Sequence, residues 1–262
     1  IFRPDGDKKR IILTPEKSIQ SQFVYGSDIM MCLDYCTHPD DSMEINEFSV
    51  EVTIEWAKRC KIEYEKQLKS RHIDKDKRPL LFAIIQGGNF PELRKYCASE
   101  LIKIGFDGFG FGGFPVDSKG NLVDDILELT AQLMPDDKPK YAMGLGKPDG
   151  IIKCVKWGYN LFDCVIPTRE ARHNRLYVFD DESSLKYHCY YILDEKHIRE
   201  KKPISDVCDC YTCRHYSRSY LQHLYKVGDS LAYRLATIHN LRFYSMLMER
   251  INDNKTNING DQ

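Results

Sequence analysis

Five short apolar segments occupy the first two thirds of the chain, and each is bounded by residues typical of turns. They are continuous rather than alternating, which is typical of parallel strands buried on both faces. These segments are residues 28–33, 80–85, 108–114, 140–145 and 161–166. Helical spacing of apolar positions separates them, at residues 44–70, 90–104, 122–134 and 148–157. This strand–helix alternation with short connections predicts right-handed βαβ units and an α/β fold.

The number of strands before Pro167 limits the architecture. A closed (β/α)₈ barrel needs eight strands and typically about 250 residues, whereas only five strand segments precede Pro167. The pattern leaves two alternatives, which are an open five-stranded sheet and the last five β/α units of a TIM-type (β/α)₈ barrel.

The character of the sequence changes after Pro167. A further strand is predicted at residues 175–179, a polar and charged stretch follows at 182–203, and helices are predicted at 214–226 and 229–252. The last residues are rich in Asn and Asp, so we expect a frayed end. The predicted divisions are a partial barrel at residues 1–174, a smaller subdomain with closing helices at 175–252, and a disordered tail at 253–262.

Composition places the chain among globular proteins. Of its 262 residues 42% are hydrophobic and 29% are charged, and no apolar run approaches the length of a membrane span. The formal net charge of −1 gives no global electrostatic case for nucleic acid, so an RNA surface would have to be a local patch. A chain of this length with ten Cys and no secretory signal favours a reducing compartment, and we expect a cytoplasmic protein.

Three cysteines are unusually close together in the sequence. Cys208, Cys210 and Cys213 form C-x-C-x-x-C, a spacing that lets three sulfurs converge on one tetrahedral ion and predicts a structural zinc site. A fourth ligand is required, and the candidates are His215, His223 and His239. His215 would strain the turn, whereas His239 lies on the last predicted helix, which could pack back over the cluster. The alternative is a set of free thiols.

Polar residues and one glycine stand at the carboxyl ends of the predicted strands, where α/β folds build their active sites. Asp163 lies within the apolar run LFDCVIP, where a carboxylate is costly unless it is paired or used. Asp34 and Gln86 end two other strands, and Gly113 leaves room for a ligand at the backbone. Together they suggest an Asp nucleophile or acid/base group beside groups able to hydrogen-bond an amide-like ring edge.

The loops after the fourth and fifth strand segments carry cations. Residues 144–150 include Lys147, and residues 168–172 include Arg169 and Arg172. Because the loops after the last two strands of a barrel often bind phosphate, these cations are candidates for RNA contacts. A solvated charged loop is the alternative interpretation.

Several longer motifs resemble one enzyme family. The chain is similar throughout to the bacterial type of tRNA-guanine transglycosylases, also called queuine tRNA-ribosyltransferases. The motifs together are highly specific for this family, although no single motif identifies it. They are GSDIMMCLDYCT at 26–37, IGFDGFGFGGF at 104–114, PDDKPKYAMGLGKPDG at 135–150, NLFDCVIPTREAR at 160–172, the cysteine cluster, and IHNLRFY at 238–244.

The resemblance implies a (β/α)₈ barrel with a C-terminal zinc-binding subdomain. It also implies a pentosyltransferase that replaces guanine at the wobble position of GUN-anticodon tRNAs by a 7-deazaguanine, either 7-aminomethyl-7-deazaguanine or queuine. The exchange passes through a covalent Asp–RNA intermediate and belongs to queuosine modification. The implied partners are tRNA, the 7-deazaguanine base and a second copy of the chain in a homodimer, with one structural Zn²⁺ per chain and no membrane.

The family's functional positions can be placed on this sequence one by one. Asp163 matches the nucleophile. The positions that match the base pocket are Asp34, Gln86, Gly113, Met143 and Gly144. Those that match RNA-contacting segments are Gly144, Leu145, Gly146, Lys147, Pro148, Asp149, Gly150, Thr168, Arg169, Glu170, Ala171 and Arg172. Those that match the zinc ligands are Cys208, Cys210, Cys213 and His239.

The chain also departs from the family pattern. The motif that supplies the family's second catalytic carboxylate is not in this sequence, and we expect it upstream of Ile1 with the first three barrel strands, which would leave this chain alone inactive. Val116 stands where enzymes that accept queuine typically have Gly, which favours the smaller 7-aminomethyl-7-deazaguanine. Asn174 also replaces a usual Gly.

Two other function classes compete with a transglycosylase. One is a non-catalytic RNA-binding paralogue or subunit, against which the retained Asp163 argues. The other is a TIM-barrel hydrolase with a structural zinc and no role with RNA, against which the TREAR and GLGKPDG segments argue.

Overall fold

The computed structural model describes residues 12–259, with side chains through Asp253. Contacts divide the chain into two compact units. The first runs to Leu145 and includes Lys153–Asp163, and the second contains Gly146–Ile152 and the chain from Cys164 onward. The sequence predicted a division after Asn174. The structure divides the chain earlier because Ala171 belongs to the hydrophobic core of the second unit.

The first unit is built on a five-stranded parallel sheet. Its strands are β1 (Ile29–Met31), β2 (Leu80–Ile85), β3 (Gly108–Phe111), β4 (Lys140–Ala142) and β5 (Leu161–Phe162). They lie side by side in chain order, with Ile29 opposite Leu80, Ile85 opposite Phe111 and Ala142 opposite Phe162. All five predicted strands are therefore confirmed, although β1, β3, β4 and β5 end earlier than predicted and β1 begins one residue later.

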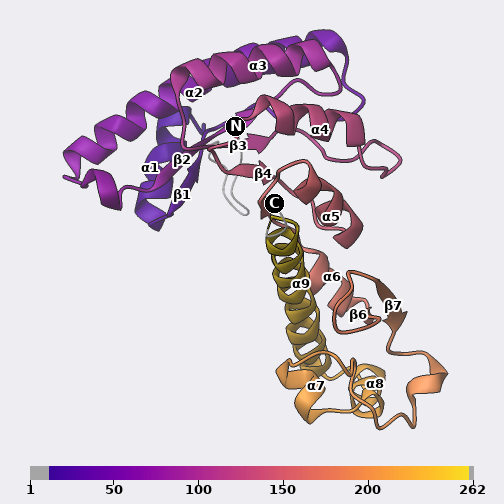
Figure 1. The fold of residues 1–262 in the computed structure, drawn as a ribbon. Coiled ribbons are helices and arrows are strands. Elements are labelled where there is room, and N and C mark those ends of the chain that lie inside the picture. The colour runs from indigo at the N-terminus through magenta and orange to yellow at the C-terminus, as the bar shows by residue number, and fades with distance from the viewer. Residues whose placement is uncertain (1–11, 260–262) are drawn as a thin grey trace. The chain divides into compact units, whose positions relative to one another are not determined.

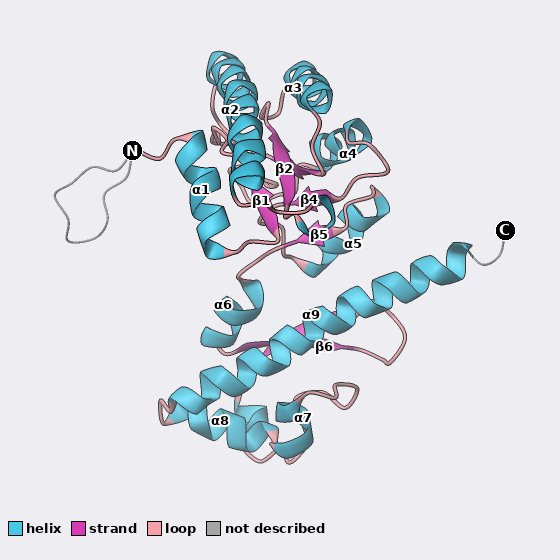
Figure 2. Cartoon of the chain, turned by 90° about the vertical axis from the view of Figure 1, so that its left-hand side faces the viewer, coloured by secondary structure: helices cyan, strands magenta, loops and turns pink. Residues whose placement is uncertain are grey.

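This strand order decides between the two predicted architectures. A doubly wound sheet reverses its strand order at a switch point, whereas here every connection advances in the same direction. Because βαβ connections are right-handed, all the connecting helices fall on one face of the sheet. The sheet is a curled half-barrel, and α2, α3 and α4 follow one another around the outside of its strands (Figure 2).

The helices of the first unit begin at predictable signals. Thr14 caps α1 by accepting from the Lys17 N–H, and Pro91 occupies the first turn of α3. Helix α1 was not predicted from the sequence, although the Thr14-Pro15 pair marks its start. Helices α2 and α3 pack against each other (Figure 1). The helices are α1 (Pro15–Tyr25), α2 (Met43–Ser70), the 3₁₀ turn η1 (Lys75–Lys77), α3 (Pro91–Ile104), α4 (Asp124–Leu133) and α5 (Pro148–Lys156), the last of which is divided between the two units.

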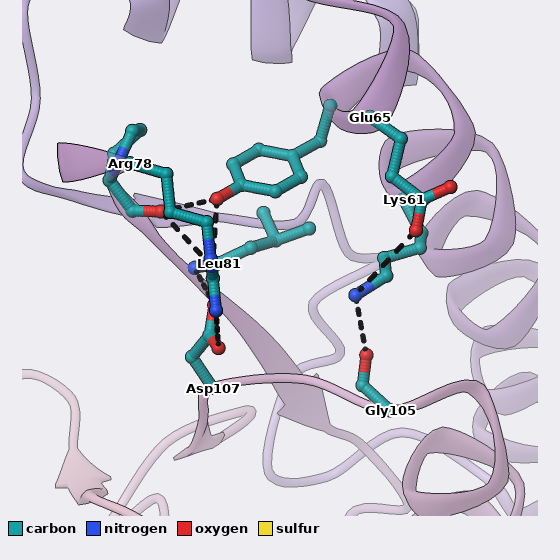
Figure 3. Close-up of polar contacts among 8 residues, drawn as sticks. Lys61, Glu65, Arg78, Leu81, Gly105 and Asp107 are labelled. Atoms are coloured by element: carbon teal, nitrogen blue, oxygen red, sulfur yellow. Dashed lines mark hydrogen bonds and ion pairs between the residues drawn. The ribbon is translucent and has the colours of Figure 1, made fainter. Parts of the chain in front are cut away.

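An ion pair joins β2 and β3 at their amino-terminal ends. The Arg78 guanidinium donates to both carboxylate oxygens of Asp107 over 2.6 and 2.7 Å, as Figure 3 shows. The Asp107 carboxylate also accepts the Leu81 N–H over 2.9 Å. Arg78 lowers the pKa of Asp107 below its ordinary value. Because this end of a barrel sheet is the one that contributes to stability, the pair is a structural clamp.

The second unit packs a hairpin against helices. Strand β6 (Arg175–Phe179) pairs antiparallel with β7 (Tyr187–Tyr191), and the core includes Leu176, Val178, Leu221 and Leu235. Asn174, the residue just before β6, has a φ of 55°. Asn tolerates this left-handed conformation better than most residues with side chains. The helices are α6 (Ile166–Arg172), the 3₁₀ turn η2 (Glu195–His197), α7 (Tyr211–His215), α8 (Arg218–Lys226) and α9 (Ser230–Asn259).

Three features of this unit differ from the sequence prediction. Strand β7 lies in the stretch that was expected to be only polar and charged. The predicted helix at 214–226 is instead two helices, because Ser217 caps a new helix by accepting the Tyr220 N–H. Helix α9 continues to Asn259, beyond the expected end at Asn252, while residues 260–262 of the predicted tail lie outside the described residues. No described helix combines the length and apolarity that a bilayer crossing requires.

Candidate functional site

The carboxyl ends of the five strands meet at one edge of the sheet, and each is followed by a residue predicted to belong to the site. Asp34 follows β1, Gln86 follows β2, Gly113 follows β3, Gly144 follows β4 and Asp163 follows β5. Because neighbouring parallel strands end side by side, the sheet order places these residues consecutively along one rim. The structure thus brings these five predicted residues to one rim, and all five lie in the first unit.

Asp34 and Gln86 are directly paired on this rim. The Gln86 Nε2 atom donates to Asp34 Oδ2 over 2.6 Å, and the Gln86 side chain is completely buried. Burial raises the pKa of the Asp34 carboxyl above its ordinary value, and the hydrogen bond from Gln86 opposes this shift. The pair is a partly desolvated acceptor held in place by an amide, which suits recognition of hydrogen-bond donors on a ring.

The glycines after β3 leave space for the Gln86 side chain and for a ligand. A Cβ on Gly112 would lie 2.7 Å from the Gln86 Cδ atom, so a larger residue there would displace the amide. Gly113 has a φ of 84°, a conformation that favours glycine. A Cβ on Gly113 would lie no closer than 3.7 Å to the atoms of the surrounding residues. The Gln86 Oε1 atom is buried and has no hydrogen-bond partner among the described residues. The site thus contains an unpaired acceptor beside a glycine with open space at its Cβ position.

Met143 lies against the middle of the sheet rather than at its edge. A Cβ on Gly110 would lie 3.0 Å from the Met143 sulfur and 3.5 Å from the Met31 methyl carbon. Two thioether side chains therefore cover a strand position that carries no side chain of its own. This arrangement places two polarizable apolar side chains over Gly110 of β3.

Asp163 has two hydrogen-bond donors on one of its oxygens. The Tyr141 hydroxyl and the Gly144 N–H each donate to Asp163 Oδ1 over 2.7 Å, while the described residues give Oδ2 no partner. Burial, together with the Asp163 carboxylate, raises the pKa of Tyr141, so this hydroxyl remains a donor. The expectation of a carboxylate buried in an apolar run was wrong, because β5 ends at Phe162 and the Asp163 side chain is exposed.

The predicted RNA-contacting segments contain both exposed and supporting residues. Lys147, Arg169 and Arg172 are exposed, and the described residues give Lys147 and Arg172 no carboxylate partner. Leu145 and Ala171 are buried, so their side chains cannot reach RNA. The remaining predicted positions follow the same division: Gly144 and Asp149 are exposed, Thr168 and Glu170 are half-buried, and Gly146, Pro148 and Gly150 are buried.

The three clustered cysteines and His239 come together in the second unit. Their four potential ligand atoms all lie within 4.8 Å of one another, and Cys213 Sγ is 3.3 Å from His239 Nδ1. His239 Nε2 lies 2.8 Å from the Tyr177 carbonyl oxygen, which assigns the ring proton to Nε2 and leaves Nδ1 free to bind a metal. Three sulfurs and one imidazole nitrogen close a tetrahedron, so the geometry fits a structural metal ion. His215 and His223 are exposed and outside the cluster.

The residues that follow His239 hold the second unit together. Asn240 is completely buried, accepts the Tyr177 N–H over 3.2 Å, and donates to the Pro167 and Arg175 carbonyls over 3.1 Å. The Tyr244 hydroxyl donates to the Gly146 carbonyl over 2.7 Å. The IHNLRFY motif therefore contributes a residue that could bind the metal, a buried amide that connects α6 to β6, and a hydroxyl bonded to the start of a predicted RNA loop.

Comparison with known proteins agrees with this arrangement. The family model described as queuine tRNA-ribosyltransferase matches residues 1–257. The chain belongs to this family. A queuine tRNA-ribosyltransferase of Mannheimia succiniciproducens is 43% identical over 243 residues, which are 93% of this chain and 60% of the relative. One of Thermoanaerobacter pseudethanolicus is 42% identical over 252 residues, which are 96% of this chain and 63% of the relative.

The chain spans only part of the relatives that it matches, 60 to 63% of the length of these two queuine tRNA-ribosyltransferases. The sequence identity nevertheless covers both units, because it extends over more than nine tenths of this chain. Family membership therefore applies to the strand-end rim and to the Cys₃His cluster alike.

Two residues at the rim were not found from the sequence. The sequence could have predicted that Tyr141 points to the opposite face of β4 from Lys140 and Ala142, because side chains alternate along a strand. In the structure Lys140 and Ala142 are buried and Tyr141 is only half-buried. Arg94 is completely buried beneath the ends of β2 and β3, and nothing in the pattern of α3 distinguishes it from a surface arginine.

Proposed function

We propose that the rim exchanges guanine at the wobble position of GUN-anticodon tRNAs for a 7-deazaguanine. One observation carries the proposal: a carboxylate held by two donors on a single oxygen lies on the same rim as an Asp–Gln pair suited to a guanine edge. The alternative of a non-catalytic RNA-binding paralogue gives no reason to fix one Asp163 oxygen and leave the other open.

The chemistry follows from the open oxygen. With Oδ1 held by Tyr141 and Gly144, Asp163 Oδ2 attacks the ribose anomeric carbon, and the C1′–N9 bond breaks as guanine leaves with the bonding electron pair. The leaving guanine takes a proton from the second catalytic carboxyl group of the family, whose motif is not in this sequence. The product is a covalent Asp163–ribose ester. The incoming 7-deazaguanine gives its N9 proton to that same carboxylate, its N9 attacks the anomeric carbon, and the ester bond breaks to release the Asp163 carboxylate.

Base recognition is assigned to Asp34, Gln86 and Gly113. A guanine-type edge offers a ring N–H and an exocyclic amine as donors, for which the Asp34 carboxylate is the acceptor. The base carbonyl accepts from the Gly113 backbone N–H and from the second hydrogen of Gln86 Nε2, whose first hydrogen goes to Asp34. Met143 and Met31 form the apolar floor on which the ring lies. Val116 pairs with Leu122 in the loop after β3 and favours the smaller 7-aminomethyl-7-deazaguanine.

The tRNA is assigned to the exposed cations of the second unit. Lys147, Arg169 and Arg172 would contact phosphates, which needs only a local patch on a chain whose net charge is −1. We also assign the protein to the cytoplasm and to a homodimer. The exposed rings of Tyr211 and Tyr220, with Tyr216 stacked on Tyr220 at a centroid distance of 5.4 Å, support self-association, since aromatic residues are enriched at interfaces.

The metal is assigned as one structural Zn²⁺ per chain, held by Cys208, Cys210, Cys213 and His239. Zinc in a closed Cys₃His set supplies no catalysis and instead connects the ends of the elements that carry its ligands. Here it would join α7 and the segment before it to the first half of α9, and through the His239–Tyr177 contact to β6.

A gel assay for the covalent intermediate tests the proposed function. A GUN-anticodon tRNA incubated with this chain joined to the family segment that carries the second catalytic carboxylate should give an adduct that resists denaturation, and incubation with excess guanine should release it. Asp163→Asn should give none. Asp180→Asn, which changes an exposed carboxylate of the second unit, is the matched control and should retain the adduct. An adduct in Asp163→Asn would remove Asp163 as the nucleophile, and tRNA binding without any adduct would favour the non-catalytic alternative.

A further inference from the structure

Arg94 is a buried cation that bonds only to backbone carbonyls. Its Nε donates to the Gly88 carbonyl over 2.7 Å, Nη1 to the Ile85 carbonyl over 3.1 Å, and Nη2 to the Gly112 carbonyl over 3.0 Å. Its side chain is 1% exposed, and its guanidinium lies 4.1 Å from the centre of the Phe111 ring. One side chain therefore joins the end of β2, the turn that follows Gln86 and the end of β3.

The position of Arg94 is unfavourable for the helix that carries it. It lies in the first turn of α3, where the helix dipole favours negative rather than positive charge. Burial lowers its pKa to about 10, which still leaves it charged at neutral pH, and no carboxylate among the described residues pairs with it. A buried charge without a counter-charge is costly, so its three carbonyl bonds have to compensate.

Arg78 provides a comparison for Arg94, because it joins the same two strands at the end away from the rim. It connects β2 and β3 at their amino-terminal ends through the Asp107 carboxylate, and it is partly exposed (Figure 3). Arg94 connects the same strands at their carboxyl-terminal ends, next to the rim. The two arginines therefore act on one strand pair, but only Arg94 touches the segments that carry Gln86 and Gly113.

The local packing leaves these segments little freedom. A Cβ on Gly87 would lie 2.7 Å from the Arg94 backbone nitrogen and 2.8 Å from its Cγ, so the turn after Gln86 lies directly on Arg94. Gly112, whose carbonyl Arg94 holds, is also the residue against which the Gln86 amide packs. A shift of either carbonyl would therefore move Gln86 relative to Gly113.

We propose that Arg94 is a positioning residue for base recognition, which fixes the spacing between Gln86 and the Gly113 backbone through three buried backbone hydrogen bonds. This inference rests on the proposed function for its ligand, a guanine-type base, but the geometry that Arg94 sets can be measured without any ligand. Lysine cannot replace arginine here, because a single ammonium cannot reproduce the planar fork that reaches three carbonyls.

The test compares Arg94→Lys and Arg94→Met with Arg78→Met in the full chain. Amide hydrogen exchange over residues 86–88 and 112–114 reports the geometry, calorimetric titration with guanine reports recognition, and thermal unfolding reports stability. Both Arg94 variants should exchange faster in these two segments and bind guanine about tenfold more weakly, as expected for losing hydrogen bonds from a charged group. Arg78→Met should lower the melting temperature without either effect.

The outcomes separate this inference from the proposed function. If exchange in the two segments and guanine affinity in Arg94→Lys equal those of Arg78→Met, the positioning role is overturned. If the parent chain binds no guanine, the base site of the proposed function fails, and the exchange data alone still decide what Arg94 does. Faster exchange spread evenly over the first unit would also overturn the inference, because it would indicate a general loss of stability.

Discussion

The Tyr141 hydroxyl and the Gly144 N–H share one oxygen of Asp163, and the Tyr141–Asp163 bond joins β4 to the residue that follows β5. A carboxylate held in this way presents its second oxygen in a fixed direction. Orientation of this kind contributes to rate through proximity rather than through charge. The sheet itself therefore holds the proposed nucleophile, and no long loop is needed for that purpose.

Tyr141→Phe removes one of the two bonds to Asp163 and leaves the ring in place. We expect adduct formation with tRNA to slow about tenfold, since Asp163 would keep only the Gly144 N–H as its fixed donor. Single-turnover kinetics at saturating tRNA, with the chain joined to the family segment that carries the second catalytic carboxylate, measure the rate, and a filter-binding assay should show unchanged tRNA affinity. Tyr96→Phe, an exposed ring on α3, is the control. An unchanged rate would show that Gly144 alone positions the carboxylate.

Asp34→Asn should weaken base binding and stabilise the fold. The asparagine can still accept from Gln86, but it loses the second acceptor that a guanine edge requires, so we expect about 100-fold weaker guanine binding by titration calorimetry. Because burial raises the pKa of Asp34 in the folded state, that state binds more protons than the unfolded chain between the two pKa values. The free energy of unfolding therefore falls as pH rises through this window, and the loss is complete above it.

The melting temperature of Asp34→Asn should accordingly exceed that of the parent at pH 7. The difference should shrink as pH falls toward about 4, where the carboxyl of the unfolded chain is itself protonated. Asp40→Asn, an exposed carboxylate in the loop after β1, should show neither change. A lower melting temperature for Asp34→Asn at pH 7 would contradict this prediction. It would mean that the charged Asp34 carboxylate stabilises the folded state more than its desolvation destabilises it.

Continuous apolar runs made most of the fold predictable from the sequence. Strands β2 and β6 have the predicted bounds, whereas β5 ends four residues early because α6 begins at Ile166, just before Pro167. Strand β7 was missed because YHCYY mixes polar and aromatic residues and buries only Tyr190. A short hairpin strand packed on one face carries a weaker hydrophobic signal than a barrel strand.

The residues of the candidate site could be predicted where a polar side chain follows a predicted strand. Gln86 and Asp163 directly follow strands and Asp34 comes three residues after the end of β1, so their rim could be anticipated. Arg94 could not, because its role depends on carbonyls that only the Gly87–Gly88 turn and the end of β3 bring together. The choice of His239 over His215 and His223 came from the resemblance, and the structure supports it by placing α9 over the cysteines.

Arg172→Ala should weaken tRNA binding in a salt-dependent way. Arg172 is exposed at the end of α6 without a carboxylate partner among the described residues, so its charge is available to a phosphate. We expect about tenfold weaker binding at low salt and a slope of log K against log salt that is smaller by about 1. Arg234→Ala, an exposed cation on α9, is the control for net charge. Equal salt slopes for the two variants would remove the segment at 168–172 from the RNA surface.

His239→Ala should release the metal and destabilise the second unit. The parent should contain one zinc per chain by elemental analysis, and the variant none, because two elements would lose their common ligand set. We expect the free energy of unfolding to fall by about 3 kcal/mol or more, which is typical of losing a structural metal or a buried network. A chelator should lower the melting temperature of the parent toward that of the variant, and added zinc should restore the parent alone.

Two other histidines serve as matched controls for this experiment. His215 and His223 were the alternative ligands on sequence grounds, and both are exposed, so His215→Ala and His223→Ala should keep the zinc and the melting temperature of the parent. His239 Nε2 bonds to the Tyr177 carbonyl, so only Nδ1 of His239 faces the cysteines. Zinc retained in His239→Ala, or lost in His215→Ala, would assign the fourth ligand to another residue.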